Sequence, residues 1–525
     1  MPTIRFISHN CAAKAPRDQK NKPGKLPAFI EEVPSKRLFA DDEVADFIAK
    51  NLPPKDWWIF GVRPEDGEDV SSERKREGQA RATIKERLQE YDCRWLKSKA
   101  NQTARAMIAK GGGVLYEDER DELELPDPYD DDGDYSGSET DPVTGFIESD
   151  APLPHTQSQF AIAASRPDQK LYAEQNYLHA APFGVDAPAG WNASGNDPSE
   201  VVLGVVDEGW TEEHVEFKNV KQFTTLGEID PEGRGHGTAV LAIICAENAG
   251  GSDLFGVVPN LKSIVMSSPW MANGGHPTRG SKAAAIAWAA CQLAKNNQRG
   301  NVLLIEAQTR VKKLLLPVEV DLLTYAVISA ATNAGVIVVE PGGNGRIAND
   351  GHVDFDDFLV YRWCRKLKRP RIEFPLAPNR AGYRDSGAII VGAVSLDVPH
   401  RRLPFSPLGN RVDVWAPGAQ VVTADSYALH REPTTLPELD PTIVSEEKAA
   451  TDVYQAGFGG TSAAAAIVAG VAAALQDACD KKGRRRLKPD EMRELFKRRG
   501  TLCFDDRTNV VLGRMPDLKK LLELL

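Results

Sequence analysis

The sequence lacks the features of a membrane protein or a classically secreted protein. No apolar run among its 525 residues reaches the roughly 18 residues that a membrane-spanning helix needs, and the longest candidate, residues 463–475, is short and rich in alanine. Residues 1–25 lack the apolar segment of a secretory signal. Seven cysteines without a C-x-x-C pair predict reduced thiols, not a disulfide framework or a zinc ribbon. We therefore expect a cytoplasmic protein without a membrane partner, although non-classical export stays open.

The sequence also lacks a basic stripe that could bind nucleic acid, so we expect no nucleic-acid partner. Its formal net charge of −11 belongs to one stretch: residues 117–141 hold thirteen acidic residues against a single arginine. Outside this stretch 63 basic residues face 62 acidic ones. A charge run mixed with Pro, Gly and Ser predicts a solvated, disordered linker.

This acidic stretch divides a chain that is about three times as long as a typical domain. Residues 1–115 are predicted to form a small helical N-terminal region, which includes a long helix over 72–110 ended by three glycines. Residues 116–155 form the acidic linker. Residues 156–525 are predicted to form the main folded domain.

In the main domain, strand and helix signals alternate. Buried strands are predicted at 201–206, 263–266, 302–305, 336–339 and 388–394, and helices near 237–247, 281–295, 319–334 and 463–479. Alternation of this kind predicts an α/β fold with a mostly parallel sheet and helices on both faces. Sites in such sheets lie at the carboxyl ends of the strands.

Two of the candidate residues come early in this domain. Asp207 directly follows the apolar run VVLGVV, a placement that is also common for structural carboxylates. His236 lies in GRGHGT, just before an apolar helix, where flanking glycines leave room for a substrate. A local hydrogen bond at the helix start is the plain alternative for this histidine.

Two further candidates come later. Asn344 ends a buried strand within EPGGNG, where an Asn–Gly pair is also a common turn. Ser462 in GGTS precedes a helix of small residues, so it is either the helix N-cap or a nucleophile held where backbone N–H groups would stabilise an oxyanion. The order Asp, His, Ser is one of the three known chain orders of the serine-nucleophile triad.

With these blocks in this order, residues 160–520 resemble the subtilisin-like serine proteases, the subtilase family. The matching blocks are VVLGVVDEG, HGTAVLA, GGNG and GTSAAAAIVAG. The resemblance implies a subtilisin-like fold and a serine endopeptidase acting on a protein or peptide substrate. It implies Ser462 as nucleophile, His236 as general base, Asp207 as the group that orients His236, and an oxyanion hole formed by Asn344 with the backbone N–H of Ser462.

The resemblance also implies that extended substrate pairs with strand edges at Ala307, Gly342 and Gly343, although the alignment there is weak. The chain departs from the family pattern at Ala466, where family members usually have proline, and this change removes no catalytic group. No cofactor or metal is implied. Calcium dependence stays open, because the sequence shows no clear calcium loop.

Alternatives remain. One is a pseudoprotease, a binding scaffold without turnover, and another is a different acyl hydrolase, which the lack of a G-x-S-x-G elbow disfavours. The N-terminal region is either a propeptide that inhibits the enzyme or a module that binds a partner.

Overall fold

A computed structural model describes the folded parts of the chain. The described residues are 5–9, 30–32, 42–51, 57–62, 115–116, 161–162 and 171–525, except for 196, 231–232, 250, 274–275, 280–281, 296–298, 312–313, 348–350, 357–358, 365–368, 379–382 and 427–450. The predicted long helix over 72–110 and the acidic linker, apart from its first residue Tyr116, lie outside the described residues.

The domain is organised around one seven-stranded sheet in which every neighbouring pair of strands is parallel. Its spatial order is β21-β19-β14-β11-β6-β8-β7. The strands are β6 (Ser199–Val206), β7 (Gln222–Leu226), β8 (Leu261–Ser267), β11 (Val302–Ile305), β14 (Ile337–Pro341), β19 (Ile389–Val394) and β21 (Val414–Pro417). All five predicted strands are confirmed. The two edge strands, β7 and β21, escaped prediction: the sequence of β7, QFTTL, is largely exposed and polar, and that of β21, VWAP, is only four residues long.

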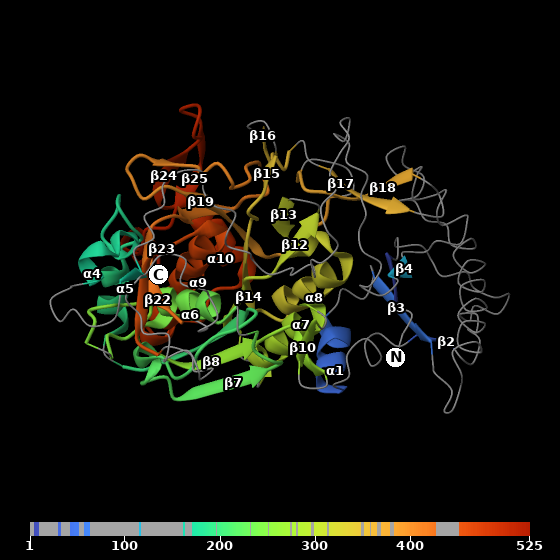
Figure 1. Cartoon of the computed structure of the whole chain (residues 1–525), viewed down its shortest axis with the longest axis horizontal. Coiled ribbons are helices and arrows are strands. Elements are labelled where there is room, and N and C mark those ends of the chain that lie inside the picture. Colours follow the sequence, from blue (N-terminus) through green and yellow to red (C-terminus); the bar gives the residue numbers. More distant parts are fainter. Residues whose placement is uncertain are drawn as a thin grey trace, which may run out of the picture.

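Helices cover both faces of this sheet (Figure 1). On one face α9 (Gly460–Lys481) packs against the sheet, and α6 (Arg234–Cys245) and α5 (Ala187–Ser194) pack on α9. On the other face lie α7 (Lys282–Leu293) and α8 (Leu322–Asn333). Alternate residues of each strand supply the two cores: Leu304 belongs to the α6 and α9 side, and Leu303 to the α7 and α8 side. The predicted α/β architecture is confirmed.

The central helix α9 is built almost entirely from small and branched apolar residues. By length and composition it could cross a membrane, yet its most apolar stretch is wholly buried inside the molecule. Alanine and glycine along its length let the helix approach the sheet closely. It is therefore a core helix, and it positions its first turn at the carboxyl edge of the sheet.

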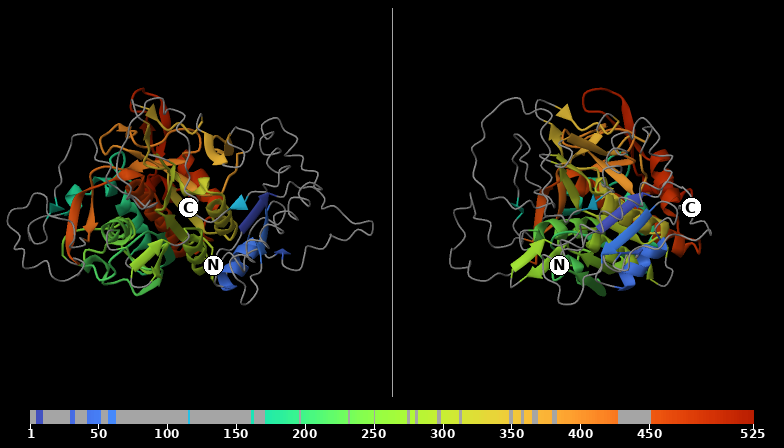
Figure 2. Two further views of the ribbon diagram at one scale, coloured as in Figure 1. Left: turned by 45° about the vertical axis from the view of Figure 1, so that its right-hand side comes forward. Right: turned by 90° about the vertical axis from the view of Figure 1, so that its right-hand side faces the viewer.

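The N-terminal region contributes a helix to the main core. In α1 (Asp42–Asn51) the side chains of Val44 and Ile48 are buried in the same apolar cluster as α7 and α8. The side chain of Asn333 donates a hydrogen bond to the Asn51 carbonyl at 3.1 Å. Figures 1 and 2 show α1 beside α7 and α8. Since α9 lies across the sheet, α1 packs on the face opposite to Ser462.

The expected helical N-terminal region is only partly helical among its described residues. It also contains an antiparallel sheet of order β2-β3-β1-β4. Its strands are β1 (Arg5–His9), β2 (Ile30–Glu32), β3 (Trp57–Val62) and β4 (Leu115–Tyr116). The run WWIFGV explains the difference, because aromatic and β-branched residues favour strands over helices.

Smaller elements surround the central sheet. Short helical turns are α4 (Leu171–Glu174), η3 (Asn176–Leu178), η4 (Val215–Phe217) and η6 (Val318–Val320). Antiparallel pairs are β9 (Trp270–Asn273) with β10 (His276–Arg279), β12 (Gln308–Val311) with β13 (Leu314–Pro317), β15 (Arg346–Ile347) with β16 (Gly351–His352), and β17 (Leu359–Cys364) with β18 (Arg369–Pro375).

Two three-stranded sheets and two C-terminal helices complete the domain. One sheet joins β22 (Val421–Asp425), β23 (Val453–Phe458) and β5 (Ala161–Ile162), and the other joins β20 (His400–Arg401), β24 (Thr501–Phe504) and β25 (Val511–Met515). The C-terminal helices are α10 (Pro489–Arg498) and α11 (Leu518–Leu522). The last elements pack back on the core, since Leu518 and Leu521 are fully buried.

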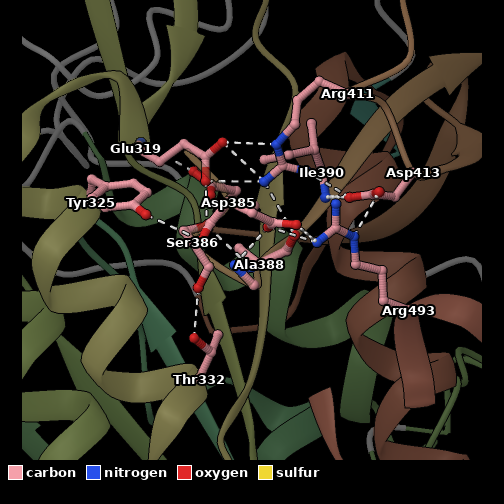
Figure 3. A network of polar contacts seen from close by, with 12 residues as sticks. Glu319, Tyr325, Thr332, Asp385, Ser386, Ala388, Ile390, Arg411, Asp413 and Arg493 are labelled. Carbon is pink, nitrogen blue, oxygen red and sulfur yellow. Dashed lines mark hydrogen bonds and ion pairs between the residues drawn. The ribbon is translucent and has the colours of Figure 1, made fainter. Parts of the chain in front are cut away.

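A buried ionic network connects η6, the segment that leads into β21, and α10 (Figure 3). The Arg411 guanidinium donates to Glu319 at 2.9 and 3.0 Å and to Asp413 at 2.7 Å, and these side chains are not exposed to solvent. From α10, Arg493 donates to the other oxygen of Asp413 at 2.8 Å and to Asp385. Each buried charge therefore has an opposite partner, which is the condition under which burial is tolerated.

Replacing Arg411 by methionine is expected to lower the free energy of unfolding by about 3–5 kcal/mol, because the Glu319 carboxylate would stay buried without its cation. Chemical denaturation measures this change. The matched control is Arg498→Met, which breaks the exposed pair with Glu494 and should cost less than about 1 kcal/mol. Equal losses in the two variants would contradict the prediction.

Candidate functional site

Asp207 and His236 meet at the carboxyl end of β6. Asp207 follows the strand directly, and His236 is the third residue of α6. The Nδ1 atom of His236 lies 2.8 Å from Oδ2 of Asp207, while the other carboxylate oxygen accepts the Glu208 backbone N–H at 2.7 Å. Because a carboxylate only accepts, the His236 proton at this contact is on Nδ1. The contact with Asp207 therefore orients the histidine ring.

Ser462 lies in the first turn of α9, which packs against α6 and over β6, β11 and β14. It is not the N-cap: Gly459 holds that position and no side chain caps the helix. The Ser462 side chain is 1% exposed, and its Oγ has no hydrogen bond of normal length and angle in the described part of the chain. A hydroxyl at this place faces the N-terminal end of a long helix, where the macrodipole favours negative charge.

Asn344 is tied to the residue before Ser462. Its Oδ1 accepts hydrogen bonds from the backbone N–H and from the hydroxyl of Thr461, both at 2.8 Å. Two donors at Oδ1 fix the orientation of the carboxamide, so Nδ2 is the group that it presents elsewhere. Gly460 has φ +82°, and a Cβ there would lie 3.0 Å from Nδ2. Asn344 is thus a held donor beside the α9 N-terminus, and not a turn residue only.

Glu306 is a site residue that the sequence reasoning did not single out. It follows β11 as Asp207 follows β6, and it is 0% exposed. Burial is the main cause that raises the pKa of its carboxyl, the neighbouring Asp207 carboxylate raises this pKa further, and the neighbouring Ser462 hydroxyl lowers it. A charged residue directly after the apolar run VLLI was the available signal. Asp207, Glu306, Asn344 and Ser462 are therefore brought together from four separate elements.

The three predicted substrate-binding residues are buried. The Ala307 side chain packs in the α7 and α8 core, on the face opposite to Ser462. At Gly343, with φ +114°, an added Cβ would lie 2.0 Å from the Leu315 carbonyl, so the hairpin β12–β13 covers this position. The backbone N–H of Gly342 donates to the Val391 carbonyl on the neighbouring strand β19. Substrate binding at these positions stays a prediction.

Within the described ranges, no three His, Cys, Asp or Glu side chains gather as a metal site would require. The Asp356 carboxylate accepts hydrogen bonds from the backbone N–H and the side-chain amide of Asn410. The expectation that the protein needs no cofactor stays a prediction.

Solved structures of several proteases resemble this chain at low identity. The prenylagaramide maturation protease PagA is 19% identical over 64% of this chain and 98% of its own, with a TM-score of 0.42. A protease from Pseudoalteromonas arctica is 18% identical over 69% and 99%, with a TM-score of 0.44. Fervidolysin from Fervidobacterium pennivorans, a keratinolytic enzyme related to subtilisin, is 19% identical over 68% and 47%, with a TM-score of 0.43.

The sequence comparison is more decisive. No curated protein matches the chain. A model of the subtilase family, however, matches residues 198–510, which is more than half of the chain and includes Asp207, His236, Asn344 and Ser462. This protein belongs to the subtilase family of serine endopeptidases.

Proposed function

We propose that this protein hydrolyses peptide bonds by a triad of Asp207, His236 and Ser462, with Asn344 in the oxyanion hole. The observation that carries the proposal is the 2.8 Å contact between His236 Nδ1 and Asp207 Oδ2, made beside the helix end that holds Ser462. The substrate class, protein or peptide, follows from the family.

The chemistry follows from these positions. A serine hydroxyl is a weak nucleophile and needs an adjacent base. With its proton held on Nδ1 by Asp207, His236 offers the lone pair of Nε2 to the Ser462 hydroxyl. Ser462 Oγ attacks the peptide carbonyl carbon, and His236 then passes the proton to the leaving amine. Water hydrolyses the resulting acyl-enzyme by the same steps in reverse order.

The negative charge on the tetrahedral intermediate needs donors that are already in place. Thr461 holds the Asn344 carboxamide by its oxygen, so its Nδ2 donates to the oxyanion without reorganisation. The backbone N–H of Ser462, in the first turn of α9, is the second donor. The helix dipole of α9 adds to the same stabilisation.

Covalent labelling tests this proposal. A fluorophosphonate should modify the wild-type protein once, and peptide mapping should place the adduct on Ser462, alongside hydrolysis of an unfolded protein substrate. If the protein is neither labelled nor able to hydrolyse the substrate, it is a pseudoprotease. Labelling with ester hydrolysis but no cleavage of peptide bonds would indicate a different acyl hydrolase.

Replacing Asn344 by alanine is expected to lower kcat by about 10²–10³-fold and to leave KM nearly unchanged, because the carboxamide meets negative charge mainly in the transition state. The magnitude is that of the same replacement in subtilisin. Steady-state kinetics on a short peptide measures it. The control Thr461→Val keeps the backbone N–H that donates to Asn344, so its kcat should fall much less. If Asn344→Ala changes only KM, Asn344 does not act in the oxyanion hole.

For the N-terminal region we propose the same two alternatives as the sequence does: a propeptide that inhibits the enzyme, or a module that binds a partner. Helix α1 packs on α7 and α8, across the sheet from Ser462, so this helix does not occupy the substrate site in the folded protein.

A further inference from the structure

Glu306 is a fully buried carboxyl that, in the part of the chain that the structure describes, lacks the partners that such a group normally has. Its side chain is 0% exposed, and neither carboxyl oxygen has a hydrogen bond of normal length and angle among the described residues. Glutamate is almost never fully buried unless it is paired. By contrast, the buried Glu319 carboxylate is held by Arg411. Among the described residues Glu306 has no ion pair, so we looked for its role at the site that it faces.

The strand register places Glu306 beside Asp207. β11 and β6 run parallel with Ile305 opposite Val206, and the Glu306 N–H donates to the Val206 carbonyl at 3.0 Å. Alternation along each strand then turns both carboxyls to the α9 side of the sheet. Two buried carboxylates so close together do not both ionise. Asp207 accepts the Glu208 backbone N–H and contacts His236 Nδ1, so Glu306 is the carboxyl of the two that keeps its proton.

The surroundings of Glu306 agree with this assignment. Burial, followed by the charge of Asp207, raises the pKa of Glu306 well above its ordinary value of 4.5, and the neighbouring Ser462 hydroxyl only partly opposes this rise. Of the other packed elements, α7 places the Lys282 ammonium on the Gln308 carbonyl at 2.6 Å. Glu340 of β14 is turned to the other face, toward Glu319. Glu306 thus keeps its proton to a much higher pH than an ordinary glutamate.

We propose, on the basis of the proposed function, that Glu306 is a positioning residue whose carboxylic acid O–H donates to Ser462 Oγ and so turns the hydroxyl proton of Ser462 toward His236. A protonated carboxyl has one donor, whereas a carboxylate only accepts. Once ionised, Glu306 would therefore accept the Ser462 hydroxyl itself and direct that proton away from His236. It would also add a second negative charge beside Asp207 and near the oxyanion. Activity should fall as Glu306 ionises.

Glu306→Gln and Glu306→Leu test the proposal. Glutamine keeps the size and an N–H donor but cannot ionise, so kcat at the pH optimum should stay within about threefold of the wild type. The wild-type pH profile of kcat should rise as His236 loses its proton and fall at alkaline pH, and the falling limb should be missing in Glu306→Gln. Leucine removes the donor, and kcat should fall about 10- to 100-fold with KM little changed.

Thermal unfolding gives a second readout, measured on the Ser462→Ala background to prevent self-digestion. A carboxyl whose pKa is raised by folding adds stability that is complete below its unfolded pKa and is lost as pH rises through its folded pKa. Glu306→Gln should remove this loss, so its Tm should fall less than that of the parent between pH 5 and pH 9.

Glu340→Gln, made in the active enzyme, is the matched control for the pH profile of kcat, since Glu340 is buried with a raised pKa on the next strand but faces away from Ser462. This variant should leave the falling limb of the kcat profile in place.

The outcomes separate the two proposals. An alkaline limb unmoved in Glu306→Gln, or no such limb in folded wild type, would overturn the role of Glu306, as would a fully active Glu306→Leu. If Glu306→Leu fails to fold, the pH profile of Glu306→Gln decides alone. If wild-type Ser462 is labelled by the fluorophosphonate, any of these results would overturn only the role of Glu306 and leave the proposed function intact. If wild-type Ser462 is not labelled, the proposed function itself is refuted, and the role of Glu306 with it.

Discussion

Replacing Ser462 by alanine is expected to lower kcat for peptide hydrolysis by about 10⁶-fold and to abolish fluorophosphonate labelling, while the protein stays folded. His236→Ala should be about as damaging, because the nucleophile and its base act as a unit. The magnitude is the one known for subtilisin, a member of the same family. Peptide kinetics and mass spectrometry measure both effects.

A remote histidine provides the control for this pair. His179 lies before α5 and has its Nε2 on the Tyr172 carbonyl at 3.1 Å, so His179→Ala should retain activity. Hydrolysis by Ser462→Ala at a rate near that of the wild type would refute Ser462 as the nucleophile. Loss of the fold in Ser462→Ala, seen in its Tm, would leave the labelling of wild-type protein as the deciding result.

Replacing Asp207 by asparagine is the second large change, with an expected loss in kcat of about 10⁴-fold. The carboxylate accepts a hydrogen bond from the Nδ1–H of His236 at 2.8 Å, whereas an asparagine amide can donate there and so favour the tautomer with its proton on Nε2. His236 would then present a donor to Ser462 where a base is needed. The magnitude is that of the corresponding change in another serine protease.

The measurement is kcat on a short peptide across the pH range, and the control is Asp197→Asn. Asp197 is largely exposed, and its carboxylate lies 3.9 Å from the Lys481 ammonium, so removing its charge should change neither stability nor activity much. A loss of less than tenfold in Asp207→Asn, with the fold retained, would show that His236 does not depend on Asp207 for its orientation.

The local sequence determined the catalytic candidates and the class of fold. The runs VVLGVV, VLLI and VIVV are apolar on both faces, so they predict buried parallel strands, and the structure has β6, β11 and β14 at those places. Asp207 and Asn344 follow such strands, and His236 and Ser462 begin helices. Their order along the chain pointed to the proposed triad, because a triad needs particular residue types at particular ends of elements.

Tertiary structure decided what lies next to what. That Glu306 and Asp207 share one face depends on the register of β11 against β6, which a single-residue shift would reverse. The burial of Gly343 depends on a hairpin inserted after β11, and the place of α1 depends on an apolar face that α7 and α8 leave to be covered. These are contacts between residues far apart in the chain. Periodicity reports which face of an element is apolar, but it does not say which other element will cover that face.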